Sequence, residues 1–143
     1  MLAIVDTGPL YATVDVDDMD HDACRAVLER PDLELVVPAL VVAEAAYLVG
    51  RRLGPGIEAA FIRGLAELEV EAPLAEEWLV IADLVERYAD FPLGTTDASV
   101  VSLAERLDTT HIVTLDRRHF GVVRSSAGQS FTLLPESTSA QGQ

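Results

Sequence analysis

Short apolar runs alternate along this chain with longer stretches in which apolar residues recur at helical spacing. The clearest runs are Leu-Ala-Ile-Val at residues 2–5 and His-Ile-Val-Thr-Leu at residues 111–115. Continuous apolar runs of this length are typical of central parallel strands, which are covered on both faces. The remaining strands are expected at residues 33–37, at 69–71 on an edge of the sheet, and within 122–123 and 131–134.

Helices are expected between these strands, at residues 9–12, 19–30, 38–53, 57–68 and 74–88, and from Thr95 or Thr96 onward. The segment 39–49 is apolar except for a single charge, Glu44, and a helix that is apolar all round is usually a buried one. A buried carboxylate without a partner is costly, so Glu44 needs a cation, a proton or a route to water. A structural ion pair is the alternative to a functional site at this position.

The alternation of short strands and helices predicts a three-layer α/β/α domain with a mostly parallel central sheet. In the helix of residues 74–88, the apolar stripe expected to face the core consists of Trp78, Ile81, Ala82 and Val85. We expect the domain to span residues 1–135. Residues 136–143 are rich in Ser, Gln and Gly and are expected to form a flexible tail.

Composition narrows the class of protein. With 143 residues, half of them hydrophobic, the chain can bury a sizeable core and is not expected to be disordered. No apolar stretch approaches the roughly 18 to 20 residues that cross a bilayer. The N-terminus begins with a strand and not with a secretory leader, so a cytoplasmic location is expected. The single cysteine, Cys24, is expected to be a small buried hydrophobe and not a reactive thiol.

Acidic residues outnumber basic ones 24 to 10, and the formal charge of −14 argues against a broad basic surface for nucleic acid. The charge does not exclude an enzyme whose carboxylates hold divalent cations, because those cations would then face the phosphate. The same imbalance favours a basic protein partner. All ten cations are arginines, so the chain contains no lysine.

Four carboxylates stand where a parallel α/β sheet would collect them. Asp6 and Asp116 each follow an apolar strand, and open α/β sheets bind ligands at the carboxyl ends of their strands. Asp97 falls in the first turn of an expected helix that starts on the same rim, and Glu44 is the lone charge of its helix. An ordinary helix N-cap is the alternative for Asp6, and a favourable interaction with the helix dipole is the alternative for Asp97.

Carboxylates that crowd together need cations, and hard oxygen ligands select Mg²⁺ or Mn²⁺. Such a site suits phosphoryl chemistry, in which cations activate water and stabilise the leaving oxygen. The three histidines, His21, His111 and His119, show no paired metal spacing, so a zinc site is not expected. His119 lies three residues after Asp116. Its side chain is expected either to approach the phosphate or to have only a surface role.

The order of these motifs resembles that of the PIN-domain nucleases. The motifs are Ile-Val-Asp-Thr-Gly at residues 4–8, the segment 38–44 ending in Glu44, Thr-Asp-Ala at 96–98 and Thr-Leu-Asp-Arg-Arg-His-Phe at 114–120. Within that group, length and motif order are similar to those of the VapC toxins of bacterial toxin–antitoxin pairs. The resemblance covers residues 1–135, and its first and last motifs are the most specific.

The resemblance implies an acidic metal site for Mg²⁺ or Mn²⁺ formed by Asp6, Glu44, Asp97 and Asp116, with Thr7 and Thr114 in support. It implies a metal-dependent endoribonuclease that leaves 5′-phosphate and 3′-hydroxyl ends. It further implies the toxin of a type II pair, a homodimer, and a VapB-like antitoxin that obstructs the site. The candidates for an RNA track are Arg51, Arg52, Arg117 and Arg118, and solvated helix ends are the equal alternative.

Two other α/β classes also place an Asp at the end of the first strand: haloacid-dehalogenase-like phosphatases and receiver domains. The first class usually has a second Asp two residues later, where this chain has Gly8, and both classes use a lysine, which the chain lacks. A further alternative is a PIN-like module without turnover that only binds a partner. The intact set of four acids argues against this alternative.

Overall fold

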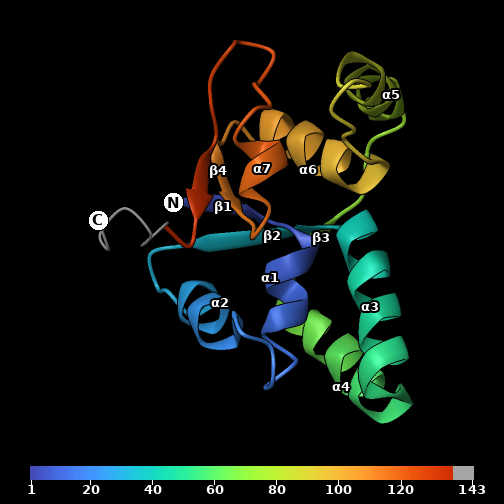
Figure 1. Cartoon of the computed structure of the whole chain (residues 1–143), viewed down its shortest axis with the longest axis vertical. Helices are drawn as coiled ribbons and strands as arrows, with labels where there is room; N and C mark the ends of the chain where they lie inside the picture. The colour runs from blue at the N-terminus through green and yellow to red at the C-terminus, as the bar shows by residue number, and fades with distance from the viewer. Residues whose placement is uncertain (137–143) are drawn as a thin grey trace.

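The computed structural model describes residues 1–136 and builds them around a five-stranded sheet (Figure 1). The strands are β1 (Leu2–Val5), β2 (Glu34–Pro38), β3 (Glu69–Glu71), β4 (His111–Val113) and β5 (Thr132–Leu134). Their order is β3-β2-β1-β4-β5, and every neighbouring pair is parallel. Residues 122–123 lie outside the strands, so that part of the prediction is wrong. The expected tail lies outside the described residues, apart from Glu136.

Helices cover both faces of the sheet, and the predicted three-layer α/β/α architecture is confirmed (Figure 1). One face carries α1 (Thr7–Ala12), α2 (His21–Leu28), α3 (Ala39–Leu53) and α4 (Pro55–Gly64). The other carries α5 (Glu77–Arg87), α6 (Thr95–Arg106) and α7 (Arg117–Phe120), and the short 3-10 helix η1 (Leu65–Glu67) leads into β3. No helix among residues 1–136 is both long and apolar enough to cross a membrane.

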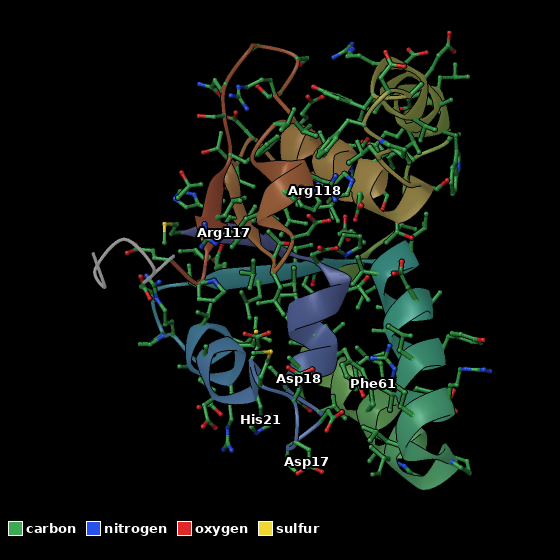
Figure 2. The ribbon with its side chains drawn as sticks, in the orientation of Figure 1. Asp17, Asp18, His21, Phe61, Arg117 and Arg118 are labelled. Carbon is green, nitrogen blue, oxygen red and sulfur yellow. The ribbon has the colours of Figure 1, made fainter. Side chains whose placement is uncertain are left out.

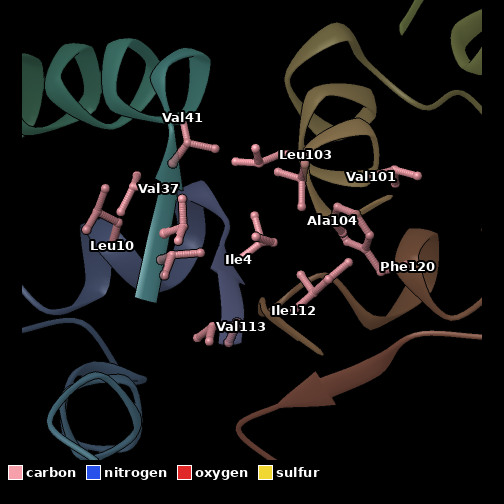
Figure 3. Packing of buried hydrophobic residues seen from close by; sticks show 14 of the residues in the cluster. Ile4, Leu10, Val37, Val41, Val101, Leu103, Ala104, Ile112, Val113 and Phe120 are labelled. Carbon is pink, nitrogen blue, oxygen red and sulfur yellow. The ribbon is translucent and has the colours of Figure 1, made fainter. Parts of the chain in front are cut away.

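The two apolar runs form the centre of the core. Residues 3–5 of β1 and residues 112–113 of β4 are almost completely buried. Leu10 of α1 and Val41 of α3 pack against them from one side, and Leu103 of α6 packs from the other (Figure 3). Burial on both faces explains why these strands are apolar without alternation.

The fully buried helix predicted for residues 38–53 is wrong. Only the stripe Val41, Ala45 and Val49 of α3 is buried, whereas Tyr47 is 62% exposed and Glu44 lies at the surface. The α3 helix runs away from the edge of the sheet at a steep angle to β2 and packs on α1 and α4 (Figure 1). Glu44 reaches water directly, so the argument from a buried charge does not hold.

The apolar stripe predicted for α5 is also wrong, since only Ile81 of its four members is buried. The buried face instead combines Ile81 with Leu84 and the acidic Glu77. Glu77 Oε2 lies 3.0 Å from the Nε atom of Arg106 at the end of α6. Ile81 and Leu84 lie four and seven positions after Glu77 and share its inward face, so Trp78 is left 48% exposed.

Candidate active site

A cleft opens at the carboxyl end of the sheet, where the neighbouring strands β1 and β4 end. Asp6 follows β1, Glu44 lies in the second turn of α3, Asp97 lies in the first turn of α6, and Asp116 directly precedes α7. The cleft is lined by Asp6, Thr7, Gly8, Glu44, Leu48, Asp97, Leu115 and Asp116. The structure therefore brings the four acidic candidates to one place.

Asp6 occupies the N-cap position of α1 but makes no capping hydrogen bond to that helix. Its carboxylate accepts a 2.8 Å hydrogen bond from Oγ1 of Thr114, and the Asp6 residue is only 5% exposed. Burial is the main cause that raises the pKa of Asp6, the Thr114 hydroxyl opposes the rise, and the carboxylates of Asp116 and Glu44 add to it. The bonding pattern of Asp6 therefore does not support a capping role.

Thr114 joins two of the acids through one hydroxyl group. Its Oγ1 atom donates to Asp6 and also accepts a 2.9 Å hydrogen bond from the backbone N–H of Asp116. The residue is 1% exposed, so water does not compete for these bonds. Thr114 thereby fixes the Asp6 side chain relative to the turn that carries Asp116.

We expect Thr114→Val to destabilise the protein and Thr114→Ser to leave its stability nearly unchanged. Valine keeps the shape of threonine but removes both hydrogen bonds, and the loss of a bond to a charged group costs on the order of 1.5–3 kcal/mol. Urea unfolding at pH 7 measures the difference among the two variants and the wild type. Equal unfolding midpoints for Thr114→Val and the wild type would contradict the assigned role.

Asp97 carries the strongest electrostatic signature of the cleft. Burial raises its pKa to about 7, with further contributions from the carboxylates of Asp6, Asp116 and Glu44, while His119 lowers it. A carboxyl group with such a pKa is partly protonated at neutral pH, because burial and the neighbouring carboxylates both disfavour its charged form. The four acidic side chains therefore lie close enough to influence one another's protonation.

Asp116 has two roles in the structure. One carboxylate oxygen accepts the backbone N–H of His119 at 2.9 Å and thereby caps α7, and the other lies 2.9 Å from the Nδ1 atom of His119. His119 is therefore half-buried, and Asp116 contacts both its backbone N–H and its ring. It lies between the Asp116 carboxylate and the ring of Phe91, whose centroid is 4.6 Å from its own.

The residues of the cleft fit a divalent cation. The hydroxyl of Thr7 is buried and has no hydrogen-bond partner within residues 1–136. Together with the carboxylates it forms a set of hard oxygen donors, which Mg²⁺ and Mn²⁺ prefer. No three His, Cys, Asp or Glu side chains in this part of the chain are gathered tightly enough to hold an ion as they stand.

None of the four candidate arginines is among the residues that line the cleft. Arg52 lies over the ring of Tyr11 at 5.0 Å, and Arg51 is an exposed residue in the last turn of α3. Arg117 donates to the carbonyl oxygen of Pro135, whereas Arg118 lies over the ring of Phe91 at 5.2 Å. Figure 2 places Arg117 and Arg118 on the α7 side of the sheet. Arg118 alone is connected to the cleft, through Phe91 and His119.

The acidic segment between α1 and α2, which contains Asp17 and Asp18, lies on the opposite side of the sheet from Arg117 and Arg118 (Figure 2). There Asp15 accepts hydrogen bonds from the Tyr11 hydroxyl and the backbone of Asp17, and Asp18 accepts one from the backbone of Asp20. These local bonds are typical of a folded, solvated turn.

The prediction for Cys24 is confirmed. Its side chain is buried in α2, and burial raises the pKa of its thiol to about 11. A thiol with this pKa stays protonated at neutral pH and is a poor nucleophile. The cysteine therefore acts as a small core residue.

The PIN domain family matches residues 3–124. Over 134 residues the chain is 40% identical to Ribonuclease VapC26 of Mycobacterium tuberculosis. This match covers 92% of the present chain and 99% of VapC26.

Two solved structures show the same fold. VapC20 of Mycobacterium tuberculosis, a toxin that cleaves the sarcin-ricin loop, aligns with a TM-score of 0.69 and 20% identity over 78% of this chain and 87% of its own. VapBC2 from Rickettsia felis, bound to a DNA fragment from its promoter, aligns with a TM-score of 0.69 and 15% identity over 93% and 98% of the two chains. The chain therefore belongs to the PIN-domain family and, within it, to the VapC ribonucleases.

Proposed function

We propose that this protein is a metal-dependent endoribonuclease that acts as the toxin of a type II toxin–antitoxin pair. The observation that carries the proposal is the gathering of Asp6, Glu44, Asp97 and Asp116 around one cleft of a PIN fold. The 40% identity to a protein named Ribonuclease VapC26 supports RNA as the substrate. We assign the activity to a nuclease domain spanning residues 1–135.

In this proposal the four carboxylates hold Mg²⁺ or Mn²⁺. Such a cation, when bound, would supply positive charge that faces the phosphate. It would also lower the pKa of water, so that hydroxide is available to attack phosphorus. Thr114 keeps the Asp6 carboxylate in a fixed orientation through its 2.8 Å hydrogen bond. The unpaired Thr7 hydroxyl is available to bind water or a carboxylate oxygen within the cleft.

We expect the purified protein to cleave RNA with Mg²⁺ or Mn²⁺, to stop when EDTA is added, and to resume when the cation is restored. Without a cation, the crowded carboxylates of the cleft repel the phosphate. Gel analysis of a labelled RNA measures the rate, and digestion of the fragments by an exonuclease that requires a 5′-phosphate tests the expected ends. Cleavage at full rate in EDTA would contradict the proposal.

The proposed partner is a basic, VapB-like antitoxin. The formal charge of −14 favours association with a basic protein, and the Rickettsia felis structure with the same fold is a VapBC complex. We also propose a homodimer. Exposed apolar side chains of α5, among them Trp78 and Leu79, offer surface for such an interface.

A further inference from the structure

An aromatic ring links one arginine to the acidic cleft. The guanidinium of Arg118 lies over the Phe91 ring at 5.2 Å, and that ring packs on His119 with 4.6 Å between centroids. His119 in turn lies 2.9 Å from the carboxylate of Asp116. The chain of contacts joins three parts of the fold: the loop before α6, helix α7 and the cleft.

The Arg118 guanidinium is available for a ligand. Among residues 1–136, the ion pairs made by arginines involve Arg25, Arg30 and Arg106, so Arg118 has no carboxylate within ion-pair distance. Its side chain is exposed. In a chain with a formal charge of −14, a cation without an acidic partner beside an acidic cleft is suited to a negatively charged substrate.

The contact with Phe91 gives the guanidinium a defined position. A planar guanidinium stacks on an aromatic face, and a charge held there loses less conformational freedom on binding than one on a free side chain. Arginine also matches the geometry of phosphate oxygens through parallel N–H donors. Phe91 belongs to the loop that leads into α6 and Asp97, so the ring positions Arg118 relative to two of the four acids.

We propose that Arg118 binds a phosphate of the RNA strand next to the acidic cleft, and that Phe91 is the positioning residue that holds its guanidinium there. The inference rests on the proposed ribonuclease function and extends it to substrate binding. If Arg118 is instead only a solvated residue at a helix end, its substitution would not change RNA binding.

Steady-state cleavage of a short labelled RNA at saturating Mg²⁺ tests the proposal. Arg118→Ala is expected to raise KM about tenfold, the effect of one charge-assisted contact, with kcat changed less than about twofold. Phe91→Leu is expected to raise KM about two- to fivefold, whereas Phe91→Tyr, which keeps the ring, restores the wild-type KM. Arg63→Ala, the same charge change at an exposed position on α4, is the matched control with an unchanged KM.

A double variant separates positioning from mere packing. If Phe91 acts through Arg118, adding Phe91→Leu to Arg118→Ala raises KM no further. Additive effects of the two substitutions overturn the role of Phe91, and an unchanged KM in Arg118→Ala overturns the phosphate contact. Thermal melting of each variant shows whether a change in KM reflects loss of folded protein.

Binding measurements keep this inference separate from the proposed function. The same variants are titrated with a fluorescein-labelled single-stranded RNA, and the Kd is read from anisotropy. If the wild type does not cleave RNA, the proposed function fails, but the ratios of Kd among the variants still decide the role of Arg118 and Phe91. Equal Kd values for the wild type, Arg118→Ala and Arg63→Ala would refute the contact.

Discussion

Asp6→Asn is expected to reduce RNA cleavage at least on the order of a thousandfold, a loss of about 4 kcal/mol in transition-state stabilisation. Asparagine has the shape of aspartate and can still accept the hydrogen bond from Thr114, but it lacks the negative charge that would hold a cation. Because burial and neighbouring carboxylates already raise the pKa of Asp6, removal of its charge should not destabilise the fold at pH 7. Initial rates with Mn²⁺ and thermal melting of the same preparations measure both effects.

Asp17→Asn is the matched control for this experiment. Asp17 is exposed in the acidic segment between α1 and α2, so the substitution changes the net charge equally but at a distance from the cleft. We expect the control variant to cleave RNA at the wild-type rate. If both variants cleave equally well, Asp6 has no part in the reaction.

The two strands that carry Asp6 and Asp116 could be predicted from sequence because burial on both faces removes polar residues from them. The residues that follow such strands in a parallel sheet lie on one rim, which is why a linear reading could group acids that are 110 residues apart. Taken alone, the first strand left local capping as an alternative for Asp6, since N-cap and site positions coincide on this rim, and only the grouping of the four acids favoured a metal ligand. The long-range hydrogen bond from Thr114 distinguishes them, and its geometry is not visible in sequence.

Features that depend on two distant segments could not be predicted. The orientation of α5 depends on its packing against α6, including the ion pair between Glu77 and Arg106, and the exposure of Glu44 depends on how α3 packs on α1 and α4. Neither cause leaves a periodic signal in the chain. Phe91 was missed for the same reason, because a single aromatic residue in a loop has no pattern that indicates its contacts with α7.

Asp97→Asn is expected to stabilise the metal-free protein at pH 8 and to lower its cleavage activity. The ordinary pKa of this carboxyl group, 3.8, is raised to about 7 in the folded protein. Between these values the folded protein keeps a proton that the unfolded chain has lost, so the wild type loses stability as the pH rises through this window and regains none above it. Asparagine does not ionise and escapes this loss.

Thermal melting in EDTA at pH 4 and pH 8 measures this effect, with Asp83→Asn on the exposed face of α5 as the control. Asp97→Asn should melt above the wild type at pH 8 and close to it at pH 4. At pH 4 the folded wild type keeps the Asp97 proton, and the unfolded chain, with an ordinary pKa of 3.8, has lost only roughly half of its own, so little of the stability loss has developed. Saturating Mg²⁺ should reverse the order at pH 8, because a ligand stabilises the protein that binds it more tightly. A lower melting temperature for Asp97→Asn in EDTA at pH 8 would show that charge repulsion in the cleft does not limit stability. The expected reversal would show that the negative charges that lower the stability of the metal-free protein are the same charges that bind the cation.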